Sequence, residues 1–109
     1  MATFFRNKVE KSVGSVPIKI IETDANTRTT VIGMSLTNIT ASTIHASILL
    51  KDDTSVEGYL IKDIAIPANS SLRPLGQASK LILAPSNELI AVCDVDDGYD
   101  IIVSYVDIV

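Results

Sequence analysis

The sequence predicts an all-β protein, an antiparallel β-sandwich of jelly-roll-like type with a short N-terminal arm or helix. Short apolar runs rich in β-branched residues recur along the chain and are separated by turn residues. Within several runs apolar and polar residues alternate, as they do in a half-buried strand. Residues 80–109 show this pattern almost without interruption. The close spacing of the runs favours a sandwich over any plan that alternates helices with strands.

The first 15 residues form a segment of their own, followed by a single sandwich domain over residues 16–109. Phe5, Val9 and Val13 recur every four residues, which suits one face of a short helix. The segment is also basic, whereas the remainder of the chain is acidic. That contrast favours an extended arm that packs on a neighbouring subunit. Both alternatives, helix and arm, stay open at this point.

Seven or eight strands are expected in the sandwich domain. In the strand expected at residues 29–38, alternation places Thr30, Ile32, Met34 and Leu36 on the same face. The last strand is apolar on both faces, so it is either central in a sheet or covered by a neighbour. The expected strands span residues 16–22, 29–38, 43–51, 59–66, 71–75, 80–83, 89–95 and 100–109.

Composition narrows the function classes. The 109 residues fit one domain, with 47% hydrophobic and only 20% charged residues. A domain this small leaves apolar groups on its surface, so we expect a subunit of an assembly. The net charge of −4 argues against nucleic acid as a partner, and no apolar run approaches the length of a membrane span. The single cysteine and the lack of a secretory signal predict synthesis in a reducing cytoplasm.

Carboxylates at Asp94, Asp96 and Asp100 around Gly98 make the sharpest local pattern. Hard oxygen ligands alternate in this way in the early part of a calcium loop. The motif is incomplete, since Tyr105 stands near the position where such a loop needs a bidentate Glu. The alternative is a hairpin turn, because Asp-Gly favours a tight β turn. We keep the three aspartates as a weak calcium candidate and otherwise predict no metal and no cofactor.

No pattern of catalytic residues emerges, and we predict that the chain is not an enzyme. His45 is the only histidine and is expected to face outward from its strand. Cys93 alternates with Leu89 and Ala91, so it is expected to be a small buried hydrophobe rather than a nucleophile. No Gly-x-Ser-x-Gly nucleophile elbow is present.

Taken in order, several segments resemble small virion structural proteins of tailed bacteriophages. They are residues 11–14 (KSVG), 29–38 (TTVIGMSLTN), 59–72 (YLIKDIAIPANSSL), 80–83 (KLIL) and 100–108 (DIIVSYVDI). One departure is the turn at residues 85–88 (PSNE), where the family leads us to expect Gly-Asp. The resemblance implies a β-sandwich subunit that is present in many copies on the virion, and it brings no catalytic residues.

The resulting prediction is a non-enzymatic virion structural protein that self-associates as a trimer or ring. Its other expected partners are virion proteins, such as the major capsid protein or neck and tail proteins. Small size favours a capsid decoration, or cement, subunit over a neck or tail accessory subunit. The competing interpretation from another class is a β-sandwich module that binds glycan or peptide, with calcium at the aspartate loop.

Overall fold

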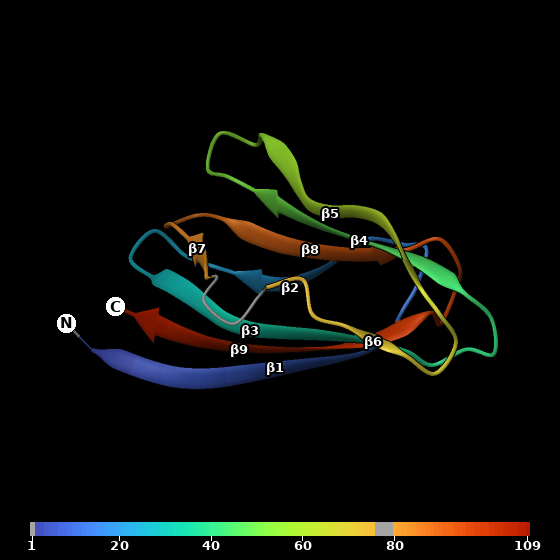
Figure 1. Cartoon of the computed structure of the whole chain (residues 1–109). Helices are drawn as coiled ribbons and strands as arrows, with labels where there is room; N and C mark the ends of the chain where they lie inside the picture. The colour runs from blue at the N-terminus through green and yellow to red at the C-terminus, as the bar shows by residue number, and fades with distance from the viewer. Residues whose placement is uncertain (1, 76–79) are drawn as a thin grey trace.

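The computed structural model describes residues 2–75 and 80–109, which form nine β-strands and no helix. The strands make two antiparallel sheets that pack face to face (Figure 1). The predicted all-β sandwich is therefore confirmed. Within the described ranges, no helix is long and apolar enough to span a membrane.

One sheet has five strands and the other has four. In the larger sheet the order is β1-β9-β3-β6, and β7 pairs with β3 beside β6; in the smaller sheet the order is β2-β8-β4-β5. The bounds are β1 Thr3–Val13, β2 Ile18–Glu22, β3 Arg28–Asn38, β4 Ile44–Lys51, β5 Glu57–Ile66, β6 Ser71–Leu72, β7 Leu81–Leu83, β8 Glu88–Cys93 and β9 Tyr99–Ile108.

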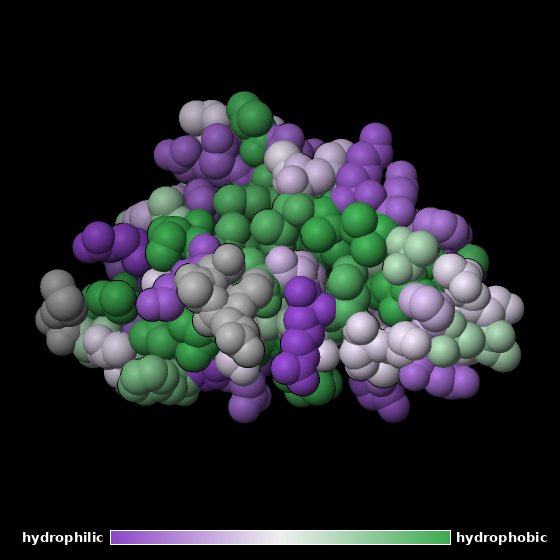
Figure 2. All heavy atoms as spheres, viewed as in Figure 1, coloured by the Kyte–Doolittle hydropathy of each residue, from purple (hydrophilic) through white to green (hydrophobic). Residues whose placement is uncertain are grey.

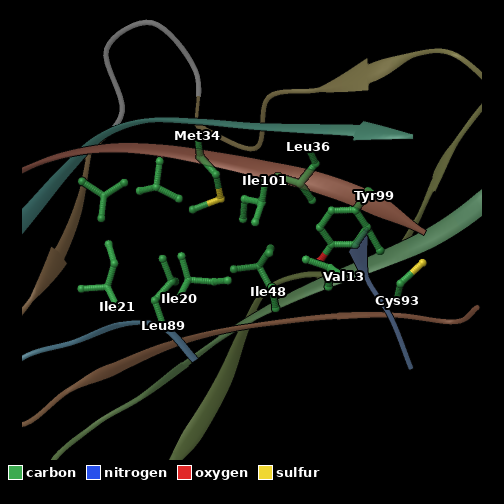
Figure 3. Close-up of a cluster of buried hydrophobic side chains, with 14 of the residues drawn as sticks. Val13, Ile20, Ile21, Met34, Leu36, Ile48, Leu89, Cys93, Tyr99 and Ile101 are labelled. Atoms are coloured by element: carbon green, nitrogen blue, oxygen red, sulfur yellow. The ribbon is translucent and has the colours of Figure 1, made fainter. Parts of the chain in front are cut away.

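The core lies between the two sheets, and Figure 3 shows its side chains pointing toward one another from both layers. Alternate residues of each strand face inward, as the pleat requires. The larger sheet contributes Leu36 and Ile101, and the smaller sheet contributes Ile48 and Leu89, all fully buried. Removing these apolar side chains from water is the main term that stabilises the sandwich.

Strand β9 is central in the larger sheet. The sequence predicted that the last strand is either central or covered by a neighbour, and the first alternative is the one observed. Strand β9 pairs with β1 on one side and with β3 on the other. Its odd-numbered residues Tyr99, Ile101 and Val103 enter the core. Ile102 lies on the opposite, outer face and stays half-exposed.

The helical alternative for the N-terminal segment is wrong. Residues 3–13 form strand β1, which pairs with β9 along almost its whole length. The four-residue spacing of Phe5, Val9 and Val13 is compatible with a strand, because residues four apart also share a face of a sheet. Phe5 and Val9 lie on the exposed outer face, whereas Val13 lies beyond an irregularity in the pairing and is buried.

The expectation that Thr30 and Ile32 share a face of β3 with Met34 and Leu36 is wrong. The pairing of β3 with β9 shifts register between Val31 and Gly33. This bulge changes the phase of the strand, so Val31 is buried and Ile32 is 46% exposed, while Met34 and Leu36 stay in the core. In β4 the alternation of the sequence is kept without such a change of phase, and Ile44, Ala46 and Ile48 share the buried face.

Candidate functional site

Of the predicted calcium residues, Asp94 and Asp96 lie in the connection between β8 and β9, whereas Asp100 is the second residue of β9. Because β8 belongs to the smaller sheet and β9 to the larger one, residues 94–98 cross from sheet to sheet. The hairpin interpretation of this loop is therefore wrong. The glycine is needed for close packing instead: a Cβ on Gly98 would lie 2.2 Å from Cys93 Sγ.

The carboxylate of Asp94 is hydrogen-bonded to His45 of strand β4. The Asp94 carboxylate accepts the backbone N–H of His45 at 2.9 Å and lies 3.1 Å from His45 Nδ1. These contacts, led by the bond from the backbone N–H, lower the pKa of Asp94. The imidazole is about half exposed, as expected for an outward-facing residue.

Asp96 and Asp100 bind two other parts of the chain. Asp96 accepts the Ser15 hydroxyl at 2.6 Å, and this bond is the main reason why the pKa of Asp96 is lowered. Asp100 accepts the backbone N–H of Ser12 at 2.9 Å. Ser12 has φ of 56°, so the carboxylate satisfies a donor where β1 leaves regular pairing.

Asp94 and Asp96 thus join the crossover loop to β4 and to the β1–β2 connection, and Asp100 joins the start of β9 to the end of β1. Each has a hydrogen-bond donor of the chain itself as partner. Among the described residues, no three His, Cys, Asp or Glu side chains come together in a group that could hold a metal ion. Calcium binding by Asp94, Asp96 and Asp100 stays a prediction, and a calcium titration of the purified chain tests it.

Cys93 lies at the end of β8 and is 4% exposed. Burial raises the pKa of its thiol, which donates a hydrogen bond to Asp94 Oδ1 at 3.6 Å. A buried thiol with a raised pKa is a poor nucleophile. The neighbouring Tyr99 is also buried, and its hydroxyl donates to the carbonyl of Val92 at 3.1 Å. Both groups are part of the packing at this end of the sandwich.

The sequence did not point to Ser12, Ser15 and His45 as the partners of these aspartates. Each lies between 49 and 88 positions away from its aspartate along the chain. Only the tertiary fold brings them together, so no local pattern identifies them.

Surface apolar side chains are the other candidate feature. Figure 2 shows hydrophobic residues gathered along the middle of the face on which β6 and β7 lie, with hydrophilic residues around much of its margin. An open hollow of about 290 Å³ borders Ile32, Met34, Leu75 and Ile102. A second hollow, of about 330 Å³, lies near the β4–β5 turn beside Val56 and Tyr59. Such apolar surface is typical of contacts with other proteins.

No protein-family model and no curated protein matches the sequence. Several solved structures share its fold. A pilus subunit of Bacillus endospore appendages, described as disulfide-linked, superposes with a TM-score of 0.57 at 6% identity over 96% of this chain and 86% of that one. A capsid chain of Helicobacter pylori bacteriophage KHP30 superposes with a TM-score of 0.53 at 8% identity, over 99% and 89% of the two chains.

A chain of the T13 particle of IBDV, an icosahedral virus, superposes with a TM-score of 0.58 at 7% identity. The match covers 96% of this chain but only 30% of the viral one, so this chain corresponds to less than a third of that chain. At these identities the likeness establishes the β-sandwich fold alone.

Proposed function

We propose that this chain is a non-enzymatic structural subunit of a bacteriophage virion that associates with copies of itself and decorates the capsid. The main support is the shared fold: the chain matches, over nearly its full length, a phage capsid chain and a pilus subunit of similar size. Both of those proteins build repetitive assemblies. The resemblance of five of its segments to virion proteins of tailed phages points in the same direction.

The arrangement of polar groups agrees with a structural role. Among the described residues, every buried side-chain nitrogen and oxygen has a hydrogen-bond partner. The aspartates, hydroxyls and histidine at the crossover are likewise bonded to one another and to the backbone. Side chains bonded in this way hold neighbouring strands and loops together.

Apolar residues on the surface supply the means of association. Phe5, Val16, Ile82 and Val56 are each more than half exposed. Their exposure costs free energy in a monomer and is relieved when a neighbour covers them. A subunit that is always surrounded by neighbours on a particle tolerates such a surface.

Mass spectrometry of purified phage particles tests the proposal. We expect the chain to be present in many copies and to be labelled by antibodies over the head in electron micrographs. Particles produced without the chain should lack that label and regain it when the purified protein is added. Label at the neck or tail would assign the accessory role instead, and absence from purified particles would contradict the proposal altogether.

A further inference from the structure

The edges of the two sheets differ in how they are protected against pairing with another chain. An unprotected edge strand presents unpaired backbone N–H and C=O groups, and proteins normally block it with bulges, prolines or short strands. β6 and β7 are only two and three residues long, and β2 has a register shift between Lys19 and Ile21. β5 has two register shifts along its pairing with β4. These edges are protected.

β1 is the exception among the described strands. Its pairing with β9 runs without a shift from Thr3 to Glu10, and the irregularity comes only after that residue. Figure 1 shows β1 along the lower border of the larger sheet, with β9 on its inner side. Eight consecutive residues therefore form a regular and open edge.

The free backbone groups of this edge can be assigned. Ala2 and Val109 exchange two backbone hydrogen bonds, of 2.8 and 2.9 Å, so they form a hydrogen-bonded pair. Such pairs alternate along an antiparallel ladder, and the register is constant up to Glu10. The even-numbered residues of β1 therefore bond β9. The odd-numbered residues Thr3, Phe5, Asn7 and Val9 direct N–H and C=O away from the molecule.

The side chains of the odd-numbered residues have a self-complementary spacing. Phe5 is 81% exposed and Val9 is 56% exposed, and each lies two residues from Asn7. If two copies of β1 pair antiparallel about Asn7, Phe5 of each copy lies directly opposite Val9 of the other. Behind them on β9 lie Val106, beside Phe5, and Ile102, beside Val9. Two apolar rows of four side chains would then cross the junction.

The basic residues of β1 do not prevent this pairing, although Arg6 of one copy would face Lys8 of the other. Both project to the opposite side of the sheet, where acidic groups of the same chain lie. Arg6 Nε is 3.1 Å from Asp107 Oδ2. Lys8 lines a hollow of about 320 Å³ together with Glu22, Asp24 and Asp107. Nearby carboxylates of their own subunit thus offset the repulsion between the two cations.

From these observations we propose that β1 of one copy pairs with β1 of a second copy about a two-fold axis at Asn7. The pairing joins two five-stranded sheets into one continuous sheet. The partner is thus a second copy of this chain. The inference rests on the proposed function, which is that the subunit associates with copies of itself, and it specifies the contact by which it does so. A two-fold contact of this kind is closed, so it produces a dimer rather than a fibre.

Proline substitutions test the assignment of the backbone groups. Val9→Pro removes an N–H that only the second copy uses, so we expect the full-length chain to remain folded while its dimer dissociation constant rises roughly 100-fold. Lys8→Pro is the matched control: it removes an N–H that bonds β9 and should lower the melting temperature of the subunit. Sedimentation equilibrium and circular dichroism measure the two effects. A wild-type chain that stays monomeric, or a dimer that Val9→Pro does not weaken, would overturn the proposal.

Disulfide trapping tests the register without relying on stability. Across the axis the Cα atoms of residue 7 would be about 5.5 Å apart, within the range for a disulfide. The Cα atoms of residue 9 would be about 14 Å apart, which is too far. Asn7→Cys should therefore form a covalent dimer on mild oxidation and Val9→Cys should not, and the native Cys93 is buried in both variants. Cross-linking of Val9→Cys alone, or covalent products larger than a dimer, would overturn the assigned axis.

These measurements use the purified chain and are independent of the particle experiment. A chain that is present in virions but has no contact at β1 would refute this inference and leave the proposed function standing. A dimer joined at Asn7, together with absence of the chain from virions, would support this inference and refute the proposed function.

Discussion

The long edge strands β1 and β5 are similar in length, at 11 and 10 residues, but they are held in different ways. β5 is fastened by side chains: Ile66 is fully buried, and Ser47 of β4 bonds the backbone of Asp63. β1 is held mainly by its ladder to β9, and only Val13 enters the core. The difference shows that one edge is closed within the subunit, while the other leaves regular backbone groups available to a neighbour.

The largest effect is expected where β5 enters the core. Ile66→Ala should lower the free energy of unfolding by about 2–5 kcal/mol, because it leaves a cavity at a fully buried position. Ile64→Ala, two residues earlier on the same strand and partly exposed, is the matched control and should cost much less. Urea denaturation of both variants measures the difference. Equal losses would mean that β5 is not anchored through Ile66.

A smaller effect is expected at the bulge of β5. Asp63 has φ of 49°, and its N–H donates to Ser47 Oγ at 2.9 Å. Ser47→Ala removes this acceptor in a buried setting and should cost about 1–3 kcal/mol. Hydrogen exchange should show faster exchange of the Asp63 amide, whereas Ser42→Ala, in an exposed turn, should leave it unchanged. Unaltered protection of this amide in Ser47→Ala would contradict the role given to the hydroxyl.

At the end of β1 the corresponding contact is Asp100 with the N–H of Ser12. Asp100→Ala should cost about 1–2 kcal/mol, because the donor loses a charged acceptor. Exchange should accelerate at the end of β1 and remain slow in β5. Asp53→Ala, in an exposed turn, is the control for loss of a carboxylate. A loss of protection spread equally over both edges would show that the two strands do not respond separately.

The smallest effect is the pH dependence at Asp94, which fastens the crossover to β4. Bonds from His45 hold the pKa of Asp94 below its ordinary value of 3.8. The stability from the ionised carboxylate is therefore present above pH 3.8 and is lost as the pH falls through the folded pKa. Asp94→Asn should be less stable than the wild type at neutral pH, and the gap should close in acid. Thermal melts between neutral pH and pH 2.5 measure it, and a constant gap would exclude this linkage.

Much of the fold follows from the sequence alone. Residues 43–51 were expected to form a strand and contain β4, and the position of Cys93 in alternation with Leu89 and Ala91 predicted its burial. The doubly apolar last strand predicted a central or covered position, and β9 is central. These features are local, because the pleat of a strand assigns each residue to one of two faces.

Other features are settled only by contacts between distant parts of the chain. A four-residue spacing fits both a helix and a strand, so β9 alone decides that residues 3–13 are extended. The bulge in β3 depends on its register with β9, and the crossover at residues 94–98 depends on which sheet each flanking strand joins. The open edge of β1 likewise depends on which strand pairs with it, because β9 occupies only one of its two sides. Periodicity describes the faces of a strand, whereas its neighbours determine which backbone groups remain unpaired.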